Sequence, residues 1–179
     1  MTAATKTRMN VDEYLAWAQS RPGRYELRGG EIVAMSPEGA GHAAVKYAVQ
    51  TALLAGIRAR GLPCHMLPDG IDEMTAYEPD ALVYCGAKLA PSATEVPAPI
   101  VIVEVLSPST RRIDTSDKLA GYFRVPSVAH YLIIDADKPL AVHHARGSGD
   151  MILTHVVTQG TIQLDPPGPA VALADIYAG

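Results

Sequence analysis

One carboxylate interrupts an otherwise apolar run, and this constrains the fold of the chain more than any other feature. The run extends from Ile100 to Leu106, and the carboxylate belongs to Glu104. An apolar run of this length is typical of a strand that is covered on both faces of a sheet. Ionising a carboxylate there costs roughly several kcal/mol unless a cation or hydrogen-bond donors compensate the charge. Metal binding, a lysine partner or catalysis would each explain why the chain keeps Glu104.

Periodicity and turn residues divide the chain into helices and strands. Asn10 and Glu13 form a predicted capping box at the first helix, and Gly29-Gly30 a predicted turn between two short strands. Ser36-Pro37 is predicted to begin the second helix. Helices are expected at 11–20, 37–60, 115–124 and 170–177, and strands at 24–28, 31–35, 63–67, 70–74, 80–84, 100–106, 130–135, 140–146 and 151–157. This order predicts a single domain, 1–179, of the α/β or α+β class, with helices on the faces of a sheet.

Composition and charge limit the functional classes. The net charge of the 179-residue chain is −4, which argues against a strong nonspecific DNA binder because such proteins usually carry a basic face. Cys64 and Cys85 are too few for a disulfide framework or a four-cysteine zinc site, so we expect two reduced core thiols. No apolar run approaches membrane-spanning length, and the polar first residues contain no signal-peptide core. We therefore expect a protein of the reducing cytoplasm.

Two further residues point to chemistry near Glu104. Pro79 favours an extended start for the strand after Asp80, which places the Asp80 carboxylate at a strand end near solvent. Lys118 lies on the helix that follows the turn after Leu106. Two acids on neighbouring strands with a nearby lysine form a divalent-metal and phosphodiester constellation. The alternatives are a buried ion pair of Glu104 with Lys118 or an arginine, and an exposed helical pair of Lys118 with Asp114.

Four other polar residues are weaker candidates. Glu26 lies on one face of its hairpin strand, where a solvated cross-strand partner is the simplest interpretation. His42, near the start of the second helix, is either a surface residue or a phosphate or metal contact. Arg111 and Arg112 follow the turn after the Glu104 strand, where they would clamp a phosphate or remain solvated.

Taken together, these segments resemble the Uma-two family of restriction-endonuclease-like proteins, which have the PD-(D/E)XK fold. The resemblance covers about Val11 to Arg146. Its most specific part is the string Glu-Val-Leu-Ser-Pro-Ser-Thr from Glu104, with Asp114, Lys118 and Tyr122 downstream. The other matching pieces are the hairpin 25–33, Met35-Ser36-Pro37, His42, Pro79-Asp80 and the strand 131–135.

The resemblance implies a mixed sheet flanked by helices and a nuclease centre that binds a divalent metal. Asp80 and Glu104 would match the two metal-binding acids. In a metal-dependent nuclease, a strand carbonyl near Val105 would help these acids to hold the metal. The general motif has its lysine two residues past the second acid, where this chain has Leu106, so Lys118 would be the displaced lysine. Glu26 would match an extra acid from the hairpin.

Two functions follow from this reasoning. The first is a Mg²⁺- or Mn²⁺-dependent nuclease that hydrolyses DNA, in which Lys118 would orient or deprotonate the attacking water. Its expected substrate contacts are His42, Arg111, Arg112 and Tyr122. The modest charge predicts weak DNA affinity of its own, and a homodimer would present two sites for a double-strand cut. The second is a catalytically silent nucleic-acid-binding or regulatory protein that retains the nuclease fold.

Overall fold

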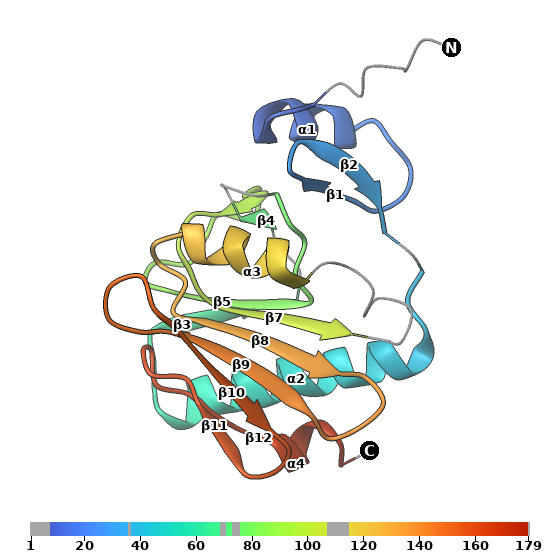
Figure 1. Ribbon diagram of the computed structural model, residues 1–179. Coiled ribbons are helices and arrows are strands. Elements are labelled where there is room, and N and C mark those ends of the chain that lie inside the picture. Colours follow the sequence, from blue (N-terminus) through green and yellow to red (C-terminus); the bar gives the residue numbers. More distant parts are fainter. Residues whose placement is uncertain (1–7, 36, 69–70, 73–75, 107–114, 179) are drawn as a thin grey trace.

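The protein was analysed as a computed structural model, which describes residues 8–35, 37–68, 71–72, 76–106 and 115–178 (Figure 1). The helices are α1 (Val11–Ala18), α2 (Ala40–Ala59), α3 (Thr115–Arg124) and α4 (Leu173–Ile176). The strands are β1 (Tyr25–Arg28), β2 (Glu31–Ala34), β3 (Cys64–Leu67), β4 (Ile71–Asp72), β5 (Ala81–Cys85), β6 (Glu95–Val96), β7 (Pro99–Leu106), β8 (His130–Asp135), β9 (Ala141–Arg146), β10 (Ile152–Val157), β11 (Thr161–Gln163) and β12 (Ala170–Ala172).

A six-stranded mixed sheet forms the centre of the molecule. Its strand order is β10-β9-β8-β7-β5-β3. β7 and β8 are parallel, and the other pairs are antiparallel. The connection from β7 to its parallel neighbour β8 runs through α3, as parallel neighbours require a crossover. The predicted mixed sheet with flanking helices is therefore confirmed.

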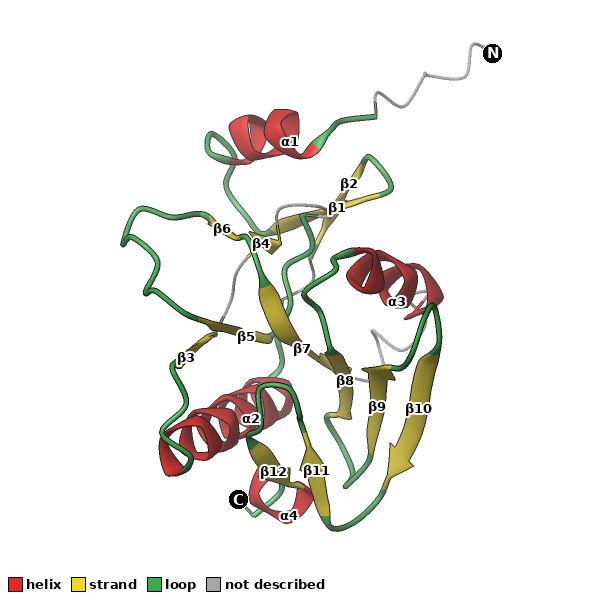
Figure 2. Cartoon of the chain, turned by 90° about the vertical axis from the view of Figure 1, so that its left-hand side faces the viewer, coloured by secondary structure: helices red, strands yellow, loops and turns green. Residues whose placement is uncertain are grey.

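The strand that carries Glu104 is covered on both faces, as its apolar run predicted. On one face, α2 packs against Val101, Val103 and Val105. On the other face, Ile102 packs in a cluster with Tyr122 of α3. Figure 2, a view turned by 90°, shows α2 and α3 on opposite sides of the sheet. Because side chains alternate along a strand, Glu104 shares the α3 face with Ile102.

The N-terminal helix and hairpin form a small layer above the sheet in Figure 1. The predicted capping box of α1 is present, with Asn10 and Glu13 each bonding the other's backbone N–H. Gly29 and Gly30 have positive φ angles in the turn between β1 and β2. Tyr14 of α1 and Leu27 of β1 are buried together in a separate cluster. The layer therefore has its own apolar contacts and still supplies side chains to the region beneath it.

Three predicted elements differ from the structure. Helix α2 begins at Ala40 with Gly39 as its N-cap, so Ser36-Pro37 does not start it, and Ser36 itself lies outside the described residues. Of the segment 70–74, the structure describes only 71–72, which form β4 and pair with β6 in a separate sheet. That β6 partner lies in a segment expected to be a loop. The expected helix 170–177 begins as β12, which pairs with β11, and only its second half is helical.

The prediction of two reduced core thiols was also wrong. Cys64 and Cys85 face each other across β3 and β5 and form a disulfide. The pairing depends on the register of two strands that are not adjacent in the chain sequence, which residue spacing does not reveal. Among the described residues, no helix has the length and apolar character that crossing a membrane would require.

Candidate active site

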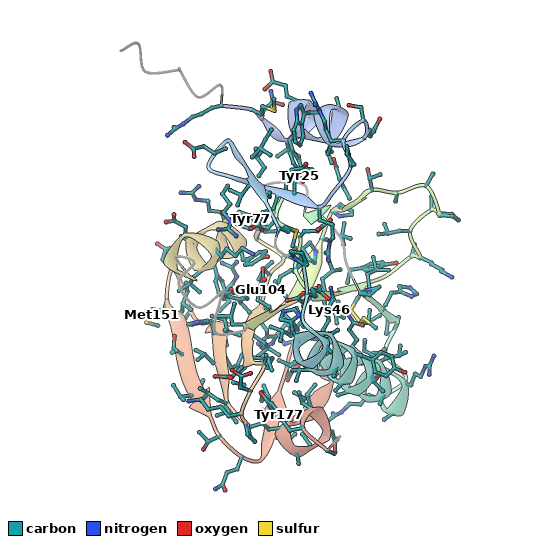
Figure 3. The ribbon with its side chains drawn as sticks, turned by 90° about the vertical axis from the view of Figure 1, so that its right-hand side faces the viewer. Tyr25, Lys46, Tyr77, Glu104, Met151 and Tyr177 are labelled. Carbon is teal, nitrogen blue, oxygen red and sulfur yellow. A yellow bond between two sulfur atoms is a disulfide. The ribbon has the colours of Figure 1, made fainter. Side chains whose placement is uncertain are left out.

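A cavity of about 490 Å³ opens at the end of β7. It is lined by residues of the hairpin, the start of α2, the start of β5 and α3. Figure 3 shows Glu104 and Lys46 between the hairpin that carries Tyr25 and the body of the sheet. Six of the residues singled out from the sequence line this cavity: Glu26, His42, Asp80, Glu104, Val105 and Lys118. The fold therefore brings together residues of β1, α2, β7 and α3 with Asp80, which directly precedes β5.

Glu104 and Lys118 form a buried ion pair on the α3 face of the sheet. The Lys118 ammonium donates to Glu104 Oε1 over 2.7 Å. The hydroxyl of Tyr122, one turn further along α3, donates to the same oxygen over 2.6 Å. Tyr122 is fully buried, and this hydrogen bond holds its hydroxyl against Glu104. Its expected contact with a substrate stays a prediction.

Glu26 joins Glu104 and Lys118 in a buried set of three charged side chains, the charge cluster. It is only 1% exposed, which corrects the interpretation of a solvated hairpin residue. Its Oε2 lies 3.1 Å from the Lys118 ammonium, and its Oε1 bonds the guanidinium of Arg28. Lys118 therefore lies between two carboxylates from opposite walls of the cavity, while Arg28 provides Glu26 with a second cation.

Burial and charge act in opposite directions on the Glu104–Lys118 pair. Burial raises the pKa of the Glu104 carboxyl, and the Lys118 ammonium and the Tyr122 hydrogen bond limit that rise. Burial also tends to lower the pKa of Lys118, but Glu104 and Glu26 outweigh it, and the net shift is upward. Lys118 therefore retains its proton at neutral pH and compensates the charge of the two acids.

Asp80 lies beside Glu104 through a backbone contact. Its Oδ2 accepts a hydrogen bond from the Val105 N–H over 2.8 Å. The Asp80 N–H in turn donates to the Val103 carbonyl, which continues the β5–β7 pairing. Asp80 is 7% exposed, so the expectation of a carboxylate near solvent was wrong. Antiparallel pairing of β5 with β7 explains why the two acids meet.

His42 lies on the first turn of α2 and faces the same place. Its side chain is 12% exposed, which corrects the surface interpretation. Its Nε2 lies 2.8 Å from the Val105 carbonyl oxygen and 3.6 Å from Asp80 Oδ2. Since a carbonyl only accepts, Nε2 carries the proton in this hydrogen bond, and neutral His42 then has a lone pair on Nδ1. Nδ1 is buried, has no hydrogen-bond partner among the described residues, and lies 4.0 Å from Glu38 Oε2.

Donor atoms of Glu38, His42 and Asp80 lie within 4.8 Å of one another. Carboxylate oxygens suit Mg²⁺ and Mn²⁺, while an imidazole nitrogen favours transition metals. Metal-binding histidines commonly donate their second ring N–H to a carbonyl, as His42 does toward Val105. These donors therefore fit a divalent cation.

Three residues of this region were missed from the sequence. Lys46 contacts Glu38 Oε1 at 3.1 Å and Asp80 Oδ1 at 3.3 Å. Gln50 donates from Nε2 to the Asp80 carbonyl over 2.8 Å. Burial tends to raise the pKa of Glu38, but the hydrogen bond and charge of Lys46 outweigh it and lower the pKa overall. The polar residues Glu38, His42, Lys46 and Gln50 recur at every fourth position, and this helical stripe was a usable signal.

Other predictions concern the remainder of the cavity. Arg111, Arg112 and Asp114 lie outside the described residues. Leu106 lines the cavity at the position where the general motif has lysine. Arg24 and Arg28 also line the cavity. The Arg24 guanidinium pairs with Glu38 and Glu78, and that of Arg28 pairs with Glu26.

Comparisons with known proteins identify relatives of the whole chain. Residues 11–174 match the model of the Uma2 family, described as "Putative restriction endonuclease". The uncharacterized protein slr1290 of Synechocystis sp. is 24% identical over 186 residues, which covers 96% of this chain and 93% of that protein. The crystal structure of a "putative nuclease belonging to DUF820" from Anabaena variabilis matches with a TM-score of 0.71 and 13% identity. That match covers 95% of this chain and 98% of the other, and shows a shared fold.

Proposed function

This chain belongs to the Uma2 family, and from that membership and the geometry of the cavity we propose that it is a divalent-metal-dependent nuclease acting on DNA. The observation that supports this most directly is the meeting of Asp80 and Glu104 at one cavity. The Val105 N–H bonds Asp80, and the Val105 peptide directly follows Glu104. Two acids, a backbone carbonyl and a lysine at one strand end form a set of groups suited to phosphodiester hydrolysis.

The metal ligands in this proposal are Asp80, Glu104 and the Val105 carbonyl, with His42 and Glu38 beside Asp80. The cation is Mg²⁺ or Mn²⁺, because the set is dominated by oxygen atoms. When bound, such a cation supplies positive charge to the scissile phosphate and makes a water molecule a stronger nucleophile. The Nδ1 of His42, which has no hydrogen-bond partner within the described part of the chain, supports an additional nitrogen ligand and would favour Mn²⁺ over Mg²⁺.

The chain's own residues have separate roles in this scheme. Lys118 is held as an ammonium between Glu104 and Glu26, so we assign it to fixing these carboxylates. Its raised pKa disfavours the hypothesis that it deprotonates the attacking water, since only the neutral amine accepts a proton. Tyr122, on α3, orients Glu104 through its hydroxyl hydrogen bond. Arg24 and Arg28 line the cavity, where their guanidinium groups would exchange an acid partner for the phosphate backbone of the substrate.

Weak DNA affinity is expected from the net charge of −4. The substrate would therefore be held mainly by the guanidinium groups at the cavity and by the metal. A homodimer that brings two sites to one duplex remains a prediction from the sequence.

The test is cleavage of supercoiled, linear and single-stranded DNA with Mg²⁺ or Mn²⁺. The variants are Asp80→Asn and Glu104→Gln, with Asp150→Asn, an exposed acid next to β10, as the matched control. We expect each site variant to lose cleavage by about 100-fold or more, and the control to match the wild type. Calorimetry should show divalent-metal binding that weakens in the same two variants.

Two results would contradict the proposal. If wild-type protein binds metal at these acids but leaves every DNA substrate intact, the protein is the catalytically silent relative. If cleavage persists in both site variants, the chemistry takes place elsewhere.

A further inference from the structure

Two lysines each connect two carboxylates at the cavity. Lys118 lies between Glu104 and Glu26, with distances of 2.7 and 3.1 Å. Lys46 lies between Glu38 and Asp80, with distances of 3.1 and 3.3 Å. The family motif accounts for one lysine, and the second is therefore a distinct feature of this site.

The two lysines differ in the exposure of their carboxylate partners. Lys118 is buried, both of its carboxylate partners are buried, and the ring of Tyr77 lies 5.7 Å from its ammonium. Lys46 has one buried partner, Asp80, and one partner at the rim, Glu38, whose side chain is 30% exposed. The Lys46 and Lys118 side chains are both 11% exposed, so the difference lies in their partners. Lys46 is therefore the lysine that reaches from a buried acid to one at the rim of the cavity.

Lys46 also contacts two of the groups that are suited to holding a metal. The donor atoms of Glu38, His42 and Asp80 converge within 4.8 Å, and the ammonium contacts both carboxylates of that set. A divalent cation held there would repel an ammonium at the same distance. Neutral His42 does not compete with a metal for the carboxylates. Its Nε2 donates to the Val105 carbonyl, and its Nδ1 has no hydrogen-bond partner among the described residues.

We propose that Lys46 gates cation binding at Asp80. Its ammonium substitutes for the cation while the site is metal-free, and it moves away when a divalent metal binds between Glu38, His42 and Asp80. The displaced ammonium then lies beside the metal site, where it contacts the phosphate of a bound phosphodiester. The phosphate contact rests on the proposed nuclease function, whereas the competition between Lys46 and the metal concerns metal affinity alone.

The gate predicts opposite effects of one substitution on two measurements. Lys46→Met removes the competing charge and keeps a side chain of similar length. We expect the metal-free variant to bind Mn²⁺ about fivefold more tightly than wild type in calorimetry without DNA. We expect its DNA cleavage at saturating Mn²⁺ to fall about tenfold or more, since the phosphate contact is lost. A residue that only supports the fold would not strengthen metal binding.

Three comparisons make the test decisive. Lys46→Arg keeps the charge and should retain wild-type or weaker Mn²⁺ affinity, and this variant also serves if Lys46→Met does not fold. Glu38→Gln should weaken Mn²⁺ binding, because it removes one proposed ligand. Lys138→Met, on the exposed turn after β8, should leave both measurements unchanged.

Each outcome has a separate meaning. Unchanged or weaker Mn²⁺ binding in folded Lys46→Met protein would overturn the gate, whether or not the wild type cleaves DNA. Tighter Mn²⁺ binding in Lys46→Arg than in wild type would overturn it as well. Tighter binding in Lys46→Met together with an inactive wild type would support the gate and overturn the nuclease function instead.

Discussion

Replacing Lys118 with methionine should make the stability of the protein strongly dependent on pH. The substitution removes the ammonium that lies between Glu104 and Glu26 and leaves both carboxylates buried. Glu26 retains Arg28 as a partner, so the uncompensated charge falls mainly on Glu104. Removing one member of a buried pair typically costs about 3 to 5 kcal/mol.

The protonation of Glu104 sets an upper limit to this loss. In the variant, Lys118 no longer opposes the effect of burial on Glu104, so the Glu104 carboxyl of the folded protein takes up a proton. In the unfolded chain the same carboxyl has a pKa of about 4.3 and releases that proton above this pH. Holding that proton at pH 7 costs about 4 kcal/mol, and at pH 5 it costs about 1 kcal/mol. A folded-state pKa above the unfolded one gives stability that is present at low pH and lost as pH rises. The variant should therefore approach the wild type near pH 5 and lose about 3 to 4 kcal/mol at pH 7.

Urea unfolding followed by circular dichroism between pH 5 and pH 8 measures this difference. The double variant Lys118→Met/Glu104→Gln should recover most of the stability at pH 7, because it contains no buried charge at Glu104. Lys138→Met is the exposed control and should stay within about 0.5 kcal/mol of wild type. A Lys118→Met protein as stable as the wild type at pH 7, or equally destabilised at every pH, would refute the reasoning.

Two further predictions concern other parts of the fold. Gly121→Ala places a Cβ 2.6 Å from Cε2 of Tyr77, so the ring must move. We expect the free energy of unfolding, measured with urea, to fall by about 1 to 3 kcal/mol. Adding Tyr77→Leu in a double variant should restore it. If the double variant is no more stable than Gly121→Ala, the ring contact is not the cause. Burial and the nearby His130 lower the pKa of His143 to about 4, so the stability it contributes is complete above pH 6.5 and decreases as pH falls toward 4. His143→Gln should flatten that decrease in the urea midpoint, and parallel curves for the two proteins would exclude His143 as its source.

Local signals predicted much of the fold. The apolar run around Glu104 correctly indicated a strand buried on both faces. Asn10 and Glu13 marked a helix start because a capping box is complete within four residues. The two glycines at 29–30 marked the hairpin turn because both adopt positive φ. In each case, the information lies within a few residues of chain.

Long-range contacts explain the failures. Glu26 appeared solvated because nothing in its strand reveals that Lys118 packs against it. The disulfide escaped prediction because the register of β3 against β5 sets it. Lys46 was overlooked because a lysine on a helix is usually solvated, and its contact with Asp80 depends on how α2 lies against the sheet. The acids themselves were found because adjacent strands bring Asp80 and Glu104 together.

The charge cluster at Lys118 also has a consequence for the protein during its synthesis. Glu26 leaves the ribosome long before α3, which carries Lys118, and the acids of β5 and β7 also emerge before that helix. A nascent chain that has not yet released α3 therefore holds its acids without the ammonium that stabilises them. Synthesis of α3 is thus the step that first supplies these buried acids with the Lys118 ammonium.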